Sequence, residues 1–112
     1  KRGFVFNKER IFANQQGYME CSSVTTSLHA FRRMISRRIT PEEITEAIKT
    51  GEIINTYQDD KPYPSVLIFK SINKQPVHVV VGKNEITGAC IIITVYIAGE
   101  DFWERDFKTK KK

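Results

Sequence analysis

Residues 76–97 read PVHVVVGKNEITGACIIITVYI, and the predicted fold is built outward from them. Two runs dense in β-branched residues flank a loop that holds Gly82 and Gly88, which is the pattern of a β-hairpin. Side chains alternate between the two faces of a strand, so the hairpin can be sorted by odd and even positions. The odd positions are all aliphatic and are expected to support a helix: Val77, Val79, Val81, Ile91, Ile93, Val95 and Ile97.

The even face of the same hairpin carries polar side chains. His78 stands on the first strand, and Thr94 and Tyr96 stand on the second. Residues directly opposite each other in an antiparallel pair share a face, so these three side chains should gather on the side that the helix leaves open. We therefore look for function on the even face.

The remaining elements are read from local patterns. Residues 25–38 show a helical spacing of apolar side chains, with Thr26 or Ser27 as N-cap. Thr40 begins a capping box ahead of a second, short helix, which Gly51 ends. Residues 52–57 and 65–72 read as two further strands. The expected buried stripe of the first helix is Leu28, Phe31, Met34 and Ile35.

These elements predict an α+β fold in which two N-terminal helices pack on a mainly antiparallel four-stranded sheet, in two layers. The length of 112 residues fits a single domain. We divide it into an N-terminal extension of uncertain structure (1–24), a core (25–107) and a basic tail (108–112).

Charge and cysteine content restrict the function classes. The net charge is +5, and residues 1–38 hold eight Lys and Arg against two acids, which favours a polyanionic partner. Cys21 and Cys90 are expected to be reduced thiols of a cytosolic type of protein. The longest apolar run, residues 89–98, is about half of the ~20 residues that a membrane helix needs. We expect a cytoplasmic location and no membrane partner, with delivery as part of a larger secreted toxin left open.

A basic row lies on the first predicted helix. His29, Arg33 and Arg37 fall at i, i+4 and i+8, Arg32 flanks them, and Arg38 lies at the helix end. Guanidinium groups present planar donor forks that suit phosphate, so the row is a candidate nucleic-acid surface. The alternative is an ordinary solvated basic face.

Several short motifs resemble a small, uncharacterised family of bacterial domains. They read HAxxRMxxRxI (29–39), PEE (41–43), GEII (51–54), YPS (63–65), PVHVVV (76–81) and ITVY (93–96). Members of that family sit beside antitoxins of the MqsA type and look like relatives of the RelE and MqsR ribonuclease toxins. The resemblance covers about residues 27–106, and Arg38 stands where the family usually has glycine.

The resemblance implies a RelE- or barnase-like two-layer architecture and a metal-independent endoribonuclease, the toxin of a bacterial toxin–antitoxin or toxin–immunity system. No cofactor is expected, and the implied partners are RNA and a cognate antitoxin or immunity protein. Such an enzyme drives the ribose hydroxyl against the adjacent phosphate, which needs a base, an acid and cations on the phosphorane.

The implied catalytic residues are drawn from both halves of the chain. His29 and His78 would exchange protons, Arg33 would hold the phosphate, Tyr96 would donate or accept a proton, and Thr94 would orient a neighbour. The expected RNA-binding residues are Arg32, Arg37, Arg38 and Lys83.

Other readings of the same residues stay open. His78 also reads as a satisfied sheet histidine, Tyr96 as a half-buried strand aromatic, and Arg33 as a partner for Glu20 or Glu43. The competing function is a non-catalytic nucleic-acid- or protein-binding module that uses the basic helix. A metal enzyme ranks third, because two histidines without a matched acid cluster make a poor metal site.

Overall fold

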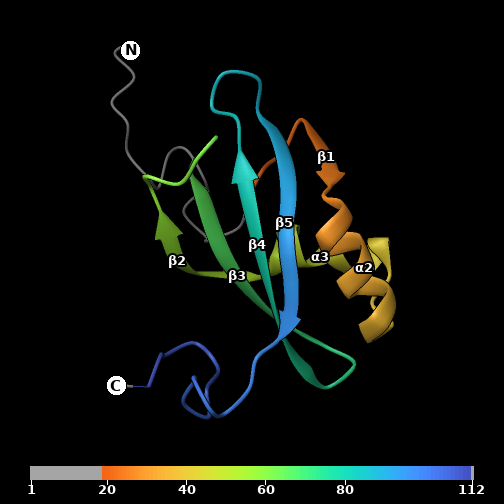
Figure 1. Cartoon of the computed structure of the whole chain (residues 1–112), viewed down its shortest axis with the longest axis vertical. Helices are drawn as coiled ribbons and strands as arrows, with labels where there is room; N and C mark the ends of the chain where they lie inside the picture. Colours follow the sequence, from red (N-terminus) through yellow and green to blue (C-terminus); the bar gives the residue numbers. More distant parts are fainter. Residues whose placement is uncertain (1–18, 112) are drawn as a thin grey trace.

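The computed structural model describes residues 19–111, so the first 18 residues of the predicted N-terminal extension lie outside the described part. Within it, five strands and two helices follow the order β1, α2, α3, β2, β3, β4, β5 (Figure 1). The helices are α2 (Leu28–Arg37) and α3 (Pro41–Thr50). The strands are β1 (Ser23–Thr26), β2 (Glu52–Tyr57), β3 (Ser65–Ile72), β4 (Gln75–Lys83) and β5 (Ala89–Ile97).

The strands form one mixed sheet in the order β1-β5-β4-β3-β2. β2 to β5 pair antiparallel with their neighbours, whereas β1 pairs in parallel with β5, from Ser23 beside Ala89 to Thr26 beside Ile92. The predicted architecture is therefore wrong, because a strand precedes the helices and joins a five-stranded mixed sheet. A strand is conceivable from the sequence over residues 18–24, but the four residues of β1 are all exposed and show no apolar alternation, so no local pattern indicates that a strand there joins the sheet.

Both helices contribute to a core on one face of the sheet. α2 packs against β5, and α3 packs against β3 and β4. Figure 1 shows α2 directly after β1 and beside the part of β5 that β1 does not cover. The buried residues of the helices and strands form one hydrophobic cluster, which includes Ala30, Met34, Ile44, Ala47, Ile48, Val66, Ile68, Val77, Val79, Val81, Cys90, Ile92 and Val95.

A β-bulge in β5 changes which side chains face this core. Val80 pairs with Thr94 but Val81 pairs with Ile92, so Ile93 is the extra residue. One extra residue reverses the parity of everything on its far side. The expectation that odd positions face the helices is confirmed for Val79 and Val95, which are fully buried.

The expectation that odd positions face the helices is wrong for the first part of β5. There Cys90 and Ile92 enter the core, while the side chains of Ile91 and Ile93 flank Gly82 on the other face.

Helix α2 begins at its expected N-cap but does not bury its expected stripe. The Oγ of Ser27 accepts a hydrogen bond from the backbone N–H of Ala30, at 3.0 Å. Ala30 and Met34 are buried, whereas the other three residues of the predicted stripe are exposed: Leu28, Phe31 and Ile35. The helix lies along the sheet edge, so the sheet covers only a narrow part of its circumference.

Helix α3 agrees with its sequence signals. Thr40 and Glu43 form the predicted capping box, and Ile44, Ala47 and Ile48 are buried. Gly51 ends the helix with a φ of −73°, so it is not there for a left-handed conformation. Glycine is required here because there is no room for a side chain. A Cβ at this position would meet the carbonyl oxygen of Ala47 and lie 2.6 Å from Cγ2 of Ile68.

A disulfide joins Cys21 to Cys90, with a Cα–Cα distance of 5.6 Å. The expectation of two reduced thiols is wrong. The two cysteines are 69 positions apart, and the parallel pairing of β1 with β5 brings them together. The spacing of the two cysteines in the sequence does not indicate this contact. In residues 19–111, neither helix is long and apolar enough to cross a membrane.

Candidate functional site

The start of α2 is fixed to the bulge in β5. Ser27 donates its backbone N–H to the carbonyl oxygen of Ile92, at 3.0 Å, and its hydroxyl to that of Ile93, also at 3.0 Å. The helix therefore begins where β1 ends and continues beside the second half of β5. This geometry carries the first turn of α2 around the sheet edge, toward the side chains on the even face.

His29 makes the first contact across that edge. Its Nε2 lies 2.9 Å from Oγ1 of Thr94, 65 positions later in the chain. The imidazole is exposed, and Thr94 is half-buried. A hydroxyl both donates and accepts, so Thr94 can hold either neutral tautomer or the imidazolium form of His29. The contact fixes one ring nitrogen and leaves Nδ1 as the group that can exchange a proton.

His78 and Tyr96 make the second contact on this face. The Tyr96 hydroxyl lies 3.1 Å from Nδ1 of His78, and Nε2 of His78 lies 2.6 Å from the carbonyl oxygen of Phe107. A carbonyl only accepts, so Nε2 carries the proton and Nδ1 accepts from the tyrosine hydroxyl. His78 is fully buried, and the ring of Trp103 stands edge-on to it, with centroids 4.5 Å apart.

Burial shifts the pKa of both partners away from the charged form. The pKa of His78 lies below its ordinary value because burial disfavours the imidazolium, an effect that the Phe107 carbonyl partly opposes. Burial also raises the pKa of Tyr96, with a smaller contribution from Tyr57 nearby. His78 is thus a neutral group that positions Tyr96, and both of its ring nitrogens are engaged within the protein.

The two contacts lie next to each other on one face of the sheet. Thr94 and Tyr96 are two positions apart beyond the bulge, paired with Val80 and His78 respectively. Such neighbours on a strand are about 6.6 Å apart and point to the same side. His29 and His78 therefore reach the same face, His29 from the edge and His78 from within the sheet.

The arginines of α2 extend this region along β5. Arg33 and Arg37 are exposed and follow His29 by one and two turns, about 6 and 12 Å along the axis. Arg37 and Arg38 line a hollow of about 550 Å³ together with Ser36, Gln75 and Ile97. The row thus runs from Thr94 to the end of β5. Within residues 19–111, no ion pair involves these arginines, since Lys108–Glu52 is the one salt bridge there.

Two of the expected RNA-binding residues lie away from this row. Arg32 is exposed on the outward side of α2. Lys83 pairs with Cys90 at the far end of β4 and lines a separate hollow with Glu20 and Lys49. Burial lowers the pKa of Lys83, and Glu20 partly opposes that shift. The structure does not bring Lys83 to the His29–Thr94–Tyr96 region.

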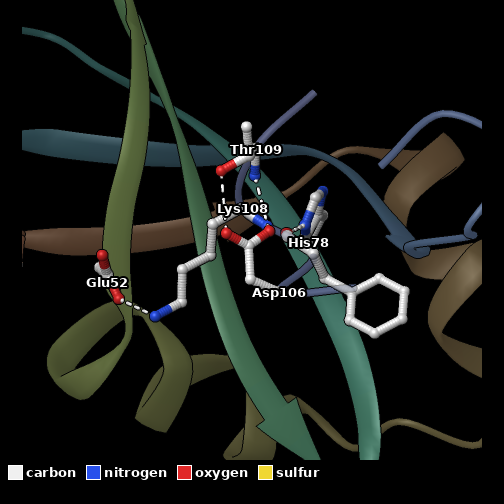
Figure 2. A network of polar contacts seen from close by, with 6 residues as sticks. Glu52, His78, Asp106, Lys108 and Thr109 are labelled. Carbon is white, nitrogen blue, oxygen red and sulfur yellow. Dashed lines mark hydrogen bonds and ion pairs between the residues drawn. The ribbon is translucent and has the colours of Figure 1, made fainter. Parts of the chain in front are cut away.

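The C-terminal segment is the part of the site that sequence reasoning missed. Lys108 forms a 2.8 Å ion pair with Glu52 on β2 and lies over the ring of Phe69, 5.5 Å from its centroid. Asp106 accepts hydrogen bonds from the backbone N–H groups of Lys108 and Thr109, which lower its pKa (Figure 2). This turn presents the Phe107 carbonyl to His78. The sequence does carry one signal, the aromatic residues Trp103 and Phe107, which favour packing of this segment on the sheet but do not show which atom it caps.

The family comparison matches residues 26–97 to DUF4258, a domain of unknown function. The match runs from the last residue of β1 to the last residue of β5 and contains His29, Arg33, His78, Thr94 and Tyr96. No curated protein and no solved structure matches the chain. Because the match spans more than half of its 112 residues, the chain belongs to the DUF4258 family.

Proposed function

We propose that this protein is an endoribonuclease that works without a metal ion, the toxin of a toxin–antitoxin or toxin–immunity system. The observation that carries the proposal is the contact between His29 and Thr94 beside Tyr96, with Arg33 one turn further along the same helix. These groups come from two elements far apart in the chain: His29 and Arg33 on α2 are exposed, and Thr94 and Tyr96 on β5 are half-buried. Together they supply a base, a hydroxyl donor and a cation.

The chemistry assigned to the set is attack of a ribose 2′-hydroxyl on the adjacent phosphorus. Nδ1 of His29 takes the proton of the 2′-hydroxyl while Thr94 holds Nε2. Arg33 neutralises charge that develops on the phosphorane. Tyr96, whose raised pKa keeps it protonated at neutral pH, turns its O–H from Nδ1 of His78 to the leaving 5′ oxygen, gives up its proton there and recovers one from water. The products are a 2′,3′-cyclic phosphate and a 5′-hydroxyl.

His78 has a different role from the one expected of it. It is buried, and both ring nitrogens are engaged, so we assign it as a positioning residue that holds the Tyr96 ring. His29 is then the one histidine that reaches the substrate. That His29 is the one histidine in contact with substrate also favours the alternative, a non-catalytic binding module. A single exposed histidine beside arginines suits a simple phosphate-binding surface as well.

The test is incubation of the protein with total RNA in EDTA. We expect cleavage with cyclic phosphate ends and no cleavage of RNA methylated at the 2′ oxygens. His29→Ala should lower the rate about a hundred-fold or more, the usual scale of general acid–base catalysis. Lys49→Ala removes an exposed cation from the other helix and serves as the matched control, with an unchanged rate.

The remaining outcomes separate the two functions. RNA binding without cleavage, weakened by Arg33→Ala, would replace the nuclease with the binding module. Neither binding nor cleavage would reject both. We place the action in the cytoplasm, with RNA and a cognate antitoxin or immunity protein as partners. The disulfide supports delivery from outside the cell, because such bonds form in oxidising compartments.

A further inference from the structure

Helix α2 has an exposed apolar stripe in addition to its buried face. Leu28 is 61% exposed, Phe31 46% and Ile35 62%. They lie at i, i+3 and i+7, so they form one continuous line along the helix. Ala30 and Met34 face the core instead. At 100° per residue, the stripe lies on nearly the opposite side of α2 from His29 and Arg33.

Such a line of side chains is typical of a helix that another protein covers. Scattered exposed apolar residues are normal, but a contiguous apolar patch on one element marks an interaction site. The i, i+3, i+7 spacing is the pattern with which a helix packs against an amphipathic partner. Leu28 and Ile35 are aliphatic and offer no ring on which a base could stack, which favours a protein over RNA as the occupant.

Charge around the stripe indicates the chemistry of that protein. Arg32 follows Leu28 by four positions and precedes Ile35 by three, so it borders both. Arg38 lies at the C-terminal end of the helix. The sequence of α2 contains no acid, and within residues 19–111 no carboxylate pairs with its arginines. A partner that brings carboxylates beside its apolar residues would complement these cations.

The chain itself does not supply such an element among the described residues. Its one acidic helix is α3, whose apolar residues Ile44, Ala47 and Ile48 are already buried in the core. Residues 1–18 contain four Lys and Arg and one acid, so their charge has the same sign as that of α2. Charge complementarity therefore favours a different protein over a second copy or the chain's own N-terminal segment.

We propose that the stripe of Leu28, Phe31 and Ile35, bordered by Arg32, is the docking surface for an acidic amphipathic helix of another protein. This inference goes beyond the proposed function and does not depend on catalysis. Its location leaves His29 and Arg33 uncovered by the docked helix, so binding of the partner and contact with RNA involve different sides of α2.

The probe is a synthetic peptide that forms a helix with leucines at i, i+3, i+4 and i+7, bordered by glutamates. Its binding to the full chain is measured by fluorescence anisotropy. We expect the double variant Leu28→Ser/Ile35→Ser to weaken binding at least about tenfold, the scale of residues central to an interface. The matched control is Ile86→Ser, because Ile86 is 94% exposed but lies between β4 and β5. Arg32→Glu should abolish binding, and a peptide with lysines in place of glutamates should restore it.

Each other outcome overturns the proposal. An unchanged affinity in the double variant, or no binding of the peptide, removes the docking surface. A concentration-dependent dimer that the double variant loses assigns the stripe to a second copy. Amide-exchange protection of residues 1–18 that disappears in the double variant assigns it to the chain's own N-terminus. Loss of polyuridylate binding in the double variant assigns it to RNA. Because the readout is binding of a peptide, a failure of the ribonuclease proposal leaves this test intact.

Discussion

Reduction of the Cys21–Cys90 disulfide is expected to lower the stability of the fold strongly. The bond closes a loop of 69 positions, which holds α2, α3 and most of the sheet. In the chain-entropy model, cross-linking a loop of this length removes about 15 cal/mol/K from the unfolded ensemble, or about 4.4 kcal/mol at room temperature. A domain of this size has a total stability of about 5–15 kcal/mol, so the loss is a large part of it.

Urea unfolding of the same protein with and without dithiothreitol measures this contribution. We expect the free energy of unfolding to fall by about 3–4 kcal/mol on reduction, slightly less than the entropic value because the reduced unfolded chain retains some compactness. The variant Cys21→Ala/Cys90→Ala is the control, since dithiothreitol should not change its unfolding curve.

Two results would refute the reasoning. Mass spectrometry of the protein purified under air could show two free thiols, in which case the bond does not form. Alternatively, the oxidised and reduced proteins could unfold within about 1 kcal/mol of each other, in which case the bond does not restrain the unfolded chain.

Four further predictions concern single features. His78 has a lowered pKa in the folded state, so the unfolded chain binds a proton at this residue more readily than the folded protein does. The free energy of unfolding should therefore fall as the pH drops below about 6.5. The urea midpoint of a His78→Gln variant should change less with pH below that value. Arg38 has a φ of 59°, so Arg38→Gly should raise stability by about 0.5–1 kcal/mol, and an equal or lower urea midpoint would contradict this. Gly51→Ala should cost about 1–3 kcal/mol, since its Cβ has no room beside Ile68; a thermal midpoint equal to that of the parent would show that the backbone shifts freely there. Arg33→Ala and Arg37→Ala should each reduce the slope of log affinity for single-stranded RNA against log salt by about 0.7, and unchanged slopes would make the row an ordinary solvated face.

Local sequence signals account for several of the helices and strands. The strands over residues 52–57 and 65–72 and the Ser27 N-cap were predicted correctly, as was the Thr40 capping box. Each depends on neighbours within a few positions, through alternation of side chains or bonding of a cap to the first turn. The same local patterns identified His29, Thr94, Tyr96 and His78 as residues of interest.

Tertiary structure decided which of these side chains meet and what they can do. β1 pairs with a strand 66 positions later, and this one pairing explains the mixed sheet, the Cys21–Cys90 bond and the placement of α2 at the sheet edge. Such pairing leaves no mark in either segment alone. The bulge at Ile93 has a similar effect, because a single extra residue exchanges the two faces of half a strand.

The exposure of His29 and the burial of His78 also depend on tertiary structure and not on local sequence patterns. Sequence supplied a row of charge on α2 and a polar face on the hairpin, but their relative positions depended on where the helix lay. With α2 at the edge, His29 reaches Thr94 and stays exposed. His78 is buried beneath the C-terminal segment, where the ring of Trp103 packs against it and the Phe107 carbonyl, 29 positions away, reaches its Nε2. A hydrogen bond across that distance depends on the path of the whole C-terminal segment, and no periodic pattern encodes it.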